Sequence, residues 1–366
     1  MPRPDRVRLV VLFGGQSAEH EVSCVSAYHV LRAAGEERYD LEAIGITREG
    51  DWVRAEDAIA ALHRGARELP ASTTGTGRLE ATGTAVEPLP AVTPTMGDDV
   101  PLVVLPLLHG PRGEDGTVQG MLELAGVPFV GAGVLGSALC MDKLKAKDVL
   151  AAHRLPQLPW LGLRDTEAGD VTRLVADAGL RYPLFVKPAN LGSSVGVSRA
   201  IDETALRESA ALAATYDEWI VIEESAHGRE IEVAVLGNAT PRASVPGEIV
   251  PTHEFYDYED KYLDGAAELV IPAELPPGVT EEIQRLAVEA FTTLRCDGMA
   301  RVDFFYEEHD RGVLINEVNT IPGFTPISMY PKLWAASGLP YGQLIDELIE
   351  LALERHERRG RFSTKR

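Results

Sequence analysis

Short apolar runs alternate with helix-like amphipathic segments along the first third of the chain. We expect strands at residues 7–13, 41–46, 100–108 and 127–130, and helices at residues 19–33 and 116–124. The first strand ends in Gly14 and Gly15, which is a turn composition. Strand, glycine turn, helix and strand in this order predict a parallel α/β domain, which we place at residues 1–136. Residues 64–99, rich in Gly, Thr, Pro and Ala, are expected to form a surface excursion with at most short strands.

The rest of the chain continues the alternation and predicts two further units. We expect helices at residues 138–153, 171–178, 201–216 and 341–358, and extended segments at residues 156–163, 183–188, 220–224 and 230–236. These elements predict a central α/β unit at residues 137–226 and a C-terminal unit at residues 227–366. A chain of 366 residues is long for one hydrophobic core, which agrees with this division.

A late run of strand-like alternation predicts a β-hairpin that carries a metal site. Side chains alternate faces along a strand, so Arg301 and Asp303 share one face, and Glu317 and Asn319 share one face. If Asp303 pairs with Glu317, the turn is centred on Asp310, where the composition favours a turn. Two carboxylates and an amide oxygen then converge beside a guanidinium. Oxygen ligands of this kind suit Mg²⁺ held together with substrate phosphates, which indicates chemistry on a nucleotide.

Composition and charge narrow the class of protein. Apolar residues make up 45% of the chain, which is typical of an ordered globular protein. The formal net charge of −21 argues against sequence-independent nucleic-acid binding, which needs a basic surface. No window approaches the roughly 20 apolar residues of a membrane span, and residues 1–8 lack the apolar core of a signal peptide. Cys24, Cys140 and Cys296 have neither disulfide nor metal-ligand spacing, so we expect buried free thiols in a cytoplasmic protein.

A glycine- and serine-rich loop follows a predicted strand in the central unit. The strand delivers Lys187, and the loop contains Gly192, Ser193, Ser194 and Gly196. A hairpin of this kind can fold over a triphosphate and donate backbone N–H and hydroxyl groups, with Lys187 as a point charge on phosphate. It is not a Walker A loop, because the lysine precedes the glycines. An ordinary Gly-Ser turn is the alternative interpretation.

Other segments rich in glycine, charged or aromatic residues lie at the ends of predicted elements. They are residues 14–19, 109–116, 221–230, 255–262 and 319–329. The first could bind a ligand at a helix N-terminus, the second lies at a strand's carboxyl end, and the third could pair with an adenine and a ribose. The fourth could form an active-site lid, and the fifth could hold a carboxylate or an oxyanion on its backbone N–H groups. For each, a turn, an exposed loop or a solvated acidic strand is the alternative.

Taken in order, these motifs resemble those of ATP-grasp enzymes, and the flanking motifs resemble the D-alanine–D-alanine ligases. The likeness covers nearly the whole chain, in residues 13–23, 108–123, 141–143, 187–197, 255–262 and 316–325. It implies an α/β, three-domain ATP-grasp fold with an N-terminal Rossmann-like domain and ATP between the second and third domains. It also implies the reaction of ATP with two D-alanines to give D-alanyl-D-alanine, ADP and phosphate through an acyl phosphate, for peptidoglycan synthesis.

The resemblance also implies a role for each matching residue. Two Mg²⁺ or Mn²⁺ ions would be held by Asp303, Glu317 and Asn319. ATP would be contacted by Lys143, Lys187, Ser193, Ser194, Val195, Glu223, Glu224, Ala226, Glu230 and Asn316. Glu19 would pair with the first D-alanine's ammonium, His109 would lie near its carboxylate, and Ser328 and Met329 would hold the second D-alanine. Arg301 and the Gly323 N–H would stabilise the oxyanion, and Lys261 and Tyr262 would form a lid in which Tyr262 reaches Ser193 and Glu19.

The chain departs from the family pattern in two places. Glu224 stands where some members carry a lysine beside the adenine, and residues 64–99 are longer than in the shorter members. A D-alanine–D-lactate ligase is the nearest alternative, but Lys261 and Tyr262 favour the dipeptide product. A catalytically dead regulator would lack a metal ligand or Arg301, and a nicotinamide-dependent oxidoreductase would need a different glycine motif. We expect a cytoplasmic homodimer that binds neither nucleic acid nor membrane.

Overall fold

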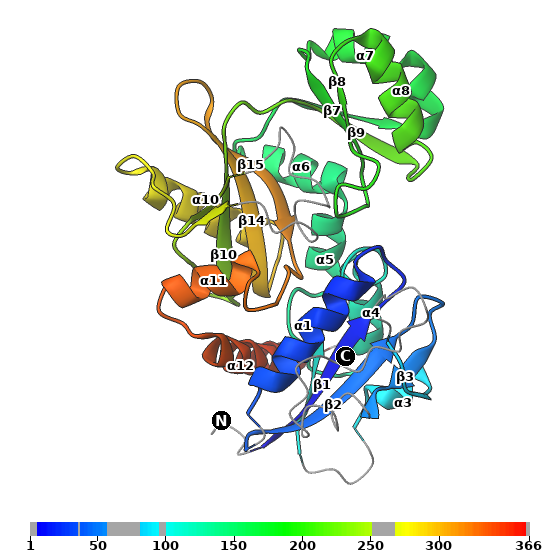
Figure 1. Ribbon diagram of the computed structural model, residues 1–366, viewed down its shortest axis with the longest axis vertical. Coiled ribbons are helices and arrows are strands. Elements are labelled where there is room, and N and C mark those ends of the chain that lie inside the picture. The colour runs from blue at the N-terminus through cyan, green and yellow to red at the C-terminus, as the bar shows by residue number, and fades with distance from the viewer. Residues whose placement is uncertain (1–5, 36, 57–80, 95–99, 251–267, 364–366) are drawn as a thin grey trace.

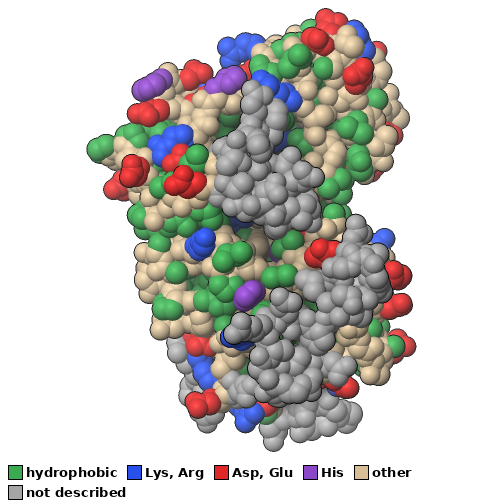
Figure 2. Space-filling view, viewed as in Figure 1, with side chains coloured by type: hydrophobic (Ala, Val, Ile, Leu, Met, Phe, Trp, Pro, Cys, Tyr) green, Lys and Arg blue, Asp and Glu red, His purple; other side chains and the backbone are tan. Residues whose placement is uncertain are grey.

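The computed structural model describes residues 6–35, 37–56, 81–94, 100–250 and 268–363. Three β-sheets, each flanked by helices, follow one another along the chain (Figure 1). In the space-filling view the outline is notched between the lobe of the central sheet and the lobe of the first sheet (Figure 2). No helix in these ranges is long and apolar enough to cross a membrane. All three cysteines lie in the described part of the chain, are buried and form no disulfide.

The first sheet is mainly parallel, as its apolar runs predict. Its strands are β1 (Val7–Gly14), β2 (Tyr39–Ile46), β3 (Trp52–Arg54), β4 (Thr84–Ala85) and β5 (Leu102–Pro106). They lie in the order β4-β3-β2-β1-β5, with β1 parallel to β2 and β5 and with β3 and β4 antiparallel. The described helices of this unit are α1 (His20–Ala33), α3 (Pro88–Ala91) and α4 (Thr117–Leu124). Both faces are buried, which is why its parallel strands are almost continuously apolar.

The central sheet is antiparallel and has its own small core. Its strands are β6 (Trp160–Arg164), β7 (Leu184–Pro188), β8 (Ser198–Ala200) and β9 (Trp219–Glu224), in the order β6-β9-β7-β8. Helices α7 (Val171–Ala178) and α8 (Glu203–Ala213) and the 3-10 helix η1 (Asp165–Asp170) accompany it. Val171, Leu206 and Ile222 belong to a cluster confined to this unit, which forms a separate lobe (Figure 1).

The third sheet is antiparallel and carries the predicted hairpin. Its strands are β10 (Arg229–Gly237), β11 (Arg242–Ala243), β12 (Gly247–Val250), β13 (Glu268–Val270), β14 (Gly298–Glu307) and β15 (Gly312–Asn319). The order is β13-β12-β10-β14-β15, with β11 also paired to β10. The helices around it are α5 (Val134–Met141), α6 (Lys143–Ala152), α10 (Val279–Thr293), α11 (Met329–Ala336) and α12 (Tyr341–Gly360). Cys140 of α5 and Leu150 of α6 share a hydrophobic cluster with α10, β14 and β15.

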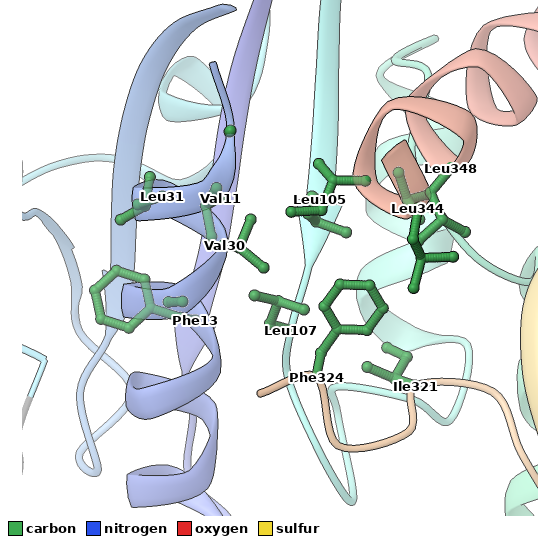
Figure 3. Close-up of a cluster of buried hydrophobic side chains, with 14 of the residues drawn as sticks. Val11, Phe13, Val30, Leu31, Leu105, Leu107, Ile321, Phe324, Leu344 and Leu348 are labelled. Atoms are coloured by element: carbon green, nitrogen blue, oxygen red, sulfur yellow. The ribbon is translucent and has the colours of Figure 1, made fainter. Parts of the chain in front are cut away.

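One hydrophobic cluster joins the first sheet to the C-terminal helices. Alternate residues of β1, such as Val11 and Phe13, face this cluster, whereas Val10 and Leu12 face the opposite side of the sheet. Figure 3 shows Val11 and Leu105 lying toward Phe324 and toward Leu344 and Leu348 of α12. The first and third sheets are therefore held together by shared apolar packing rather than by a surface contact.

Arg355 of α12 adds a polar bond between the same two parts. Its side chain is buried and donates to the carbonyl oxygens of Phe129 (2.9 Å) and Gly131. The guanidinium carbon also lies 4.1 Å from the centroid of the Phe129 ring, a cation–π contact. Burial lowers the pKa of Arg355 to about 10, so the group still carries its charge at neutral pH.

Most predicted elements are confirmed to within a few residues at each end, but two predictions are wrong. The strand predicted at residues 127–130 is only an isolated bridge between Val104 and Phe129. The single helix predicted at residues 138–153 is two helices, because Asp142 has an extended backbone and accepts a hydrogen bond from the Lys145 N–H at 2.9 Å. Helices α10 and α11 were not anticipated. Of the expected surface excursion at residues 64–99, the structure describes residues 81–94, which contain β4 and α3.

We predict that Arg355→Ala destabilises the protein by about 3 kcal/mol, because it leaves two buried carbonyl oxygens without a charged donor. Arg361→Ala is the matched control at the end of the same helix, since Arg361 pairs with Glu357 on the exposed surface. That control should change the free energy of unfolding by less than about 1 kcal/mol. Urea unfolding followed by fluorescence measures both variants, and equal effects would contradict the structural role of Arg355.

Candidate functional site

The predicted pairing within the hairpin is confirmed, with one added irregularity. Asp303 of β14 lies opposite Glu317 of β15, and Arg301 lies opposite Asn319. The register then shifts by one residue, so that Phe304 pairs with Ile315 and Asn316 forms a β-bulge. A small pocket is lined by both Asn316 and Glu317, which are neighbours in sequence and would face opposite ways in a regular strand. The bulge therefore adds a polar residue to the acidic face.

Arg301 and Asn319 orient the carboxylate of Asp303. The guanidinium donates to both oxygens of Asp303 at 2.7 Å, and the Asn319 amide donates to Oδ2 at 2.8 Å. Arg301 also lies 3.0 Å from Glu232 on the adjacent strand β10. Burial alone would lower the pKa of Arg301, but Asp303, Glu232 and Glu317 outweigh it and raise the pKa well above its ordinary value. The guanidinium is therefore a permanent positive charge.

The donor set at this hairpin fits a hard divalent cation. Because Asn319 donates through Nδ2, its amide oxygen is the group that can bind a metal, beside the carboxylates of Asp303 and Glu317. Glu230 lines the same small pocket. The described residues contain no group of three or more His, Cys, Asp or Glu side chains suited to a metal, as expected for a site of two carboxylates and an amide.

Two lysines hold the buried Glu223 of β9, and of these Lys147 is buried and Lys187 is 17% exposed. Lys187 of β7 forms an ion pair with one oxygen of Glu223, and Lys147 of α6 lies 2.8 Å from the other. Burial alone would raise the pKa of Glu223, yet the two lysines lower it to about 2. Burial alone would lower the pKa of Lys187, whereas Glu223, Glu317 and Glu230 raise it. The alternative of a solvated acidic strand is therefore wrong, because Glu223 and Glu224 are both buried.

Lys147 was not anticipated from the sequence. It follows Lys143 by four residues on one helix, so the two side chains lie on the same face. That spacing, read together with the acidic strand β9, is the signal that could have identified it.

Lys143 connects the glycine- and serine-rich loop to the hairpin. Its Nζ donates to the carbonyl oxygen of Leu191 in the loop and lies 3.9 Å from Glu317. Ser193 and Ser194 have left-handed backbones, with φ of 51° and 58°, which are uncommon for residues other than glycine. Successive residues in such a turn can point their N–H groups toward one anion. The Ser193 Oγ is buried and has no hydrogen-bond partner within the described residues.

The first sheet brings Glu19 and His109 to this loop. Glu19 precedes α1, is buried, and has its Oε2 3.3 Å from the position that a Cβ on Gly192 would occupy. A side chain at position 192 would crowd this carboxylate. His109 follows β5 and its Nδ1 donates to the carbonyl oxygen of Ile321 at 3.0 Å. Its buried Nε2 has no hydrogen-bond partner in the described part of the chain.

Glu114 is a second residue that sequence reasoning passed over, although it lies in the loop singled out at residues 109–116. Burial first, and then the charge of Glu19, raise the pKa of Glu114 to about 8, against the opposing effects of the Gly110 N–H and Lys143. Glu114 is therefore mainly protonated at neutral pH, so it adds little negative charge beside Glu19.

The loop after β15 brings Gly323 and Ser328 together. A Cβ on Gly323 would lie 3.1 Å from the Ser328 Oγ, and Ser328 accepts a hydrogen bond from the Thr325 N–H at 3.1 Å. Met329 begins α11 and is buried. Lys261 and Tyr262 lie outside the described residues, so the expected contacts of Tyr262 with Ser193 and Glu19 stay predictions.

Comparisons with known proteins match most of the chain to one family. Residues 8–132 match the family described as D-ala D-ala ligase N-terminus, and residues 149–350 match D-ala D-ala ligase C-terminus. A D-alanine–D-alanine ligase of Ruminiclostridium cellulolyticum is 46% identical over 361 residues, covering 96% of each chain. One from Listeria welshimeri is 44% identical over 368 residues, covering 98% of this chain and 99% of the relative.

Solved structures give the same result for the fold. The D-alanine–D-alanine ligase of Coxiella burnetii superposes with a TM-score of 0.78 at 37% identity, covering 98% of this chain and 97% of that one. The VanG D-Ala:D-Ser ligase of Enterococcus faecalis also superposes with a TM-score of 0.78, at 34% identity, covering 95% of this chain and 99% of that one. The solved structures that share this fold therefore include ligases named for different acceptors, D-alanine and D-serine.

We predict that Glu223→Gln destabilises the protein by about 3 kcal/mol at pH 7, because the buried Lys147 and the partly buried Lys187 lose their counter-charge. The pKa of Glu223 is lowered to about 2 from 4.5, so its stabilisation is present above pH 4.5 and is lost as the pH falls through about 2. The difference between wild type and variant should thus be constant from pH 7 to pH 5 and shrink below it.

The control for this variant is Glu218→Gln, which breaks the exposed pair of Glu218 with Arg164. Its effect should stay below about 1 kcal/mol. Urea titrations across the pH range measure both. A Glu223→Gln protein as stable as the control variant would contradict the pairing of Glu223 with the two lysines.

Proposed function

The chain belongs to the D-alanine–D-alanine ligase family, and we propose that the residues brought together above carry out that family's reaction. The protein is an ATP-dependent D-alanine–D-alanine ligase of the ATP-grasp fold, and its product serves peptidoglycan synthesis. The observation that carries the residue assignment is the pairing of Asp303 with Glu317, flanked by Arg301 and Asn319. It places two carboxylates, an amide and a guanidinium at one end of the hairpin, beside the lysines of α6 and β7.

The reaction joins two D-alanines through an activated carboxyl group. The carboxylate of the first D-alanine attacks the γ-phosphorus of ATP and releases ADP. The neutral amine of the second attacks the resulting acyl phosphate, and the tetrahedral intermediate expels phosphate. This sequence needs positive charge around the transferring phosphoryl group and hydrogen-bond donors around the oxyanion.

Lysines and backbone N–H groups bind the nucleotide in this proposal. Lys143 and Lys187 contact the phosphates, and the left-handed turn at Ser193 and Ser194 covers them, continuing to Val195. The adenine and ribose lie along residues 223–230, with Glu230 on the ribose. Because Lys187 is held by the buried Glu223, its ammonium is fixed in place before ATP arrives, which reduces the ordering cost of binding.

Two divalent cations complete the nucleotide site in this proposal. Asp303, Glu317 and Asn319 are the residues that would hold Mg²⁺ or Mn²⁺, since their oxygens form the donor set described above. Such ions neutralise negative charge on the β- and γ-phosphates. Arg301 contributes without a metal, because it keeps the carboxylate of Asp303 in one orientation.

Residues of the first and C-terminal units supply the D-alanine contacts in this proposal. We assign the ammonium of the first D-alanine to Glu19, which is buried and lies close to Gly192 of the phosphate loop. His109 lies near the reacting carboxylate, with one ring nitrogen fixed by the Ile321 carbonyl and the other turned into a buried space. Arg301 and the Gly323 N–H stabilise the oxyanion, Ser328 and Met329 hold the second D-alanine, and Lys261 and Tyr262 close over the site.

The boundaries 1–136, 137–226 and 227–366 remain our division of the chain. Each contains one sheet, which supports the division, although α5 and α6 pack on the core of the third sheet. A cytoplasmic location and a homodimeric state complete the proposal, and their support is the family resemblance alone.

The acceptor is the point at which related enzymes differ. We predict that purified protein releases phosphate from ATP and Mg²⁺ when D-alanine is present, and does not when D-lactate or D-serine is the only added substrate. A product ratio, measured by mass spectrometry with D-alanine and a competing acceptor at pH 7, should favour D-alanyl-D-alanine almost entirely. A mixed ester or a D-alanyl-D-serine as the main product would overturn the acceptor assignment.

We predict that Glu317→Gln lowers kcat at least about a hundredfold at saturating Mg²⁺ and ATP, because it removes a negative charge from the residues that would hold the divalent cations. The matched variant is Glu308→Gln, in the turn of the same hairpin and exposed. It should keep kcat within about twofold of wild type. Near-normal turnover of Glu317→Gln would refute the metal assignment.

A further inference from the structure

A chain of buried ion pairs encloses the linker between β9 and β10. Arg311, in the turn of the hairpin, donates through Nε and Nη2 to the two oxygens of Glu307 at 2.6 and 2.7 Å. It also donates to Glu224, the last residue of β9, at 3.1 Å. On its other side Glu224 accepts from the Arg181 side chain at 3.2 and 3.3 Å. One arginine from the C-terminal unit thus meets one from the central unit at a single carboxylate.

The same groups bind the linker backbone directly. Arg311 donates to the Ser225 carbonyl oxygen at 2.8 Å, and the His227 N–H donates to Glu307 at 2.7 Å. The residue between them, Ala226, is therefore held at both of its neighbours. Gly228 closes the turn against the sheet, since a Cβ there would lie 2.3 Å from the Tyr306 carbonyl oxygen. The position of the linker is therefore fixed by the side chains of Arg311 and Glu307.

Arg181 and Arg311 differ in how far their side chains are buried. The side chain of Arg311 is 18% exposed and its partners Glu224 and Glu307 are 7% and 2% exposed, whereas Arg181 is 76% exposed. An exposed pair contributes little, but removing one partner of a buried set leaves uncompensated charge. Hydrogen bonding to Arg311 lowers the pKa of Glu307 to about 2, so the carboxylate is charged throughout the physiological range. The ion pairs of Glu224 and Glu307 therefore depend mainly on Arg311.

We propose that Arg311 is a positioning residue for the adenine of ATP, acting through Glu224, Glu307 and the backbone of Ser225 and His227. This inference rests on the proposed placement of the nucleotide along residues 223–230. A base edge is read by N–H and C=O groups at fixed positions, and the loss of one ångström of placement weakens such contacts sharply. Glu224 therefore serves the adenine site through its ion pairs, where some family members place a lysine.

The test separates the base end of the nucleotide from its phosphate end. Calorimetry with Mg²⁺ and without D-alanine measures binding of ATP and of tripolyphosphate, which has no base or ribose. For Arg311→Lys, which keeps a charge but loses the planar fork, we expect ATP binding and the KM for ATP to weaken about tenfold. Tripolyphosphate binding, the KM for D-alanine and kcat at saturating ATP should stay within about twofold.

Two further variants keep the result interpretable. Glu307→Gln keeps an acceptor for the His227 N–H but removes the charge, and it should weaken ATP binding about threefold with tripolyphosphate unchanged. If Arg311→Lys fails to fold, Glu307→Gln alone tests the inference. Arg8→Lys is the matched control, because Arg8 makes a similar pair with Glu42 in the first sheet, each 19% exposed. It should leave the KM for ATP unaltered.

Unchanged ATP affinity in Arg311→Lys and Glu307→Gln would overturn the inference, and so would equal weakening of ATP and tripolyphosphate. Lys187→Ala distinguishes this failure from a failure of the proposed nucleotide site. It should weaken both ligands, because it removes a charge from the phosphates. If Lys187→Ala altered neither, the placement of ATP itself would be wrong.

Discussion

Buried negative charge must be neutralised, and this requirement organises the region between the central and third sheets. Glu223, Glu224, Glu232, Asp303 and Glu307 are all buried on strands β9, β10 and β14. Each is matched by a lysine or arginine, and for all but Asp303, which pairs with Arg301 of its own strand, that cation lies outside the strand of the carboxylate. An unpaired carboxylate in such a place would cost several kcal/mol, so the cations fix how the elements meet. The positions of α6, β7 and the hairpin turn therefore depend on these pairs as much as on apolar packing.

This balance also explains how a site rich in carboxylates can receive a nucleotide. ATP brings further negative charge, and Lys187 is already engaged by Glu223. An ammonium has three donor hydrogens, so Lys187 keeps two beyond the one that faces Glu223. Lys147, on the other oxygen of Glu223, adds a second positive charge beside that carboxylate. The remaining acidic face, Asp303 and Glu317, is suited to cations that accompany the phosphates, so the net charge of the loaded site stays small.

The sequence predicted most of the secondary-structure elements, but it missed several long-range contacts between them. Strand periodicity placed Asp303 opposite Glu317, because a two-residue period and a turn composition are both local signals. The bulge at Asn316 was not predicted, because no local sequence pattern indicates it, and it leaves the turn at residues 308–311. Three residues were missed because the groups that they meet lie far away in sequence. Lys147 meets Glu223, Glu114 lies near the charge of Glu19, and Arg311 meets Glu224. Asp142 split a predicted helix because capping competed with an otherwise helical pattern.

The contacts that attach the central lobe differ from those that join the first and third sheets. The first and third sheets share a continuous apolar cluster, so they behave as one body, whereas the central sheet has its own small core. Its contacts with the rest of the molecule include ion pairs and the packing of Leu144 against Ala189 and Val221. Lys147 and Arg311 therefore fasten the central lobe through charged contacts to Glu223 and Glu224, whereas interlocked apolar side chains join the first and third sheets.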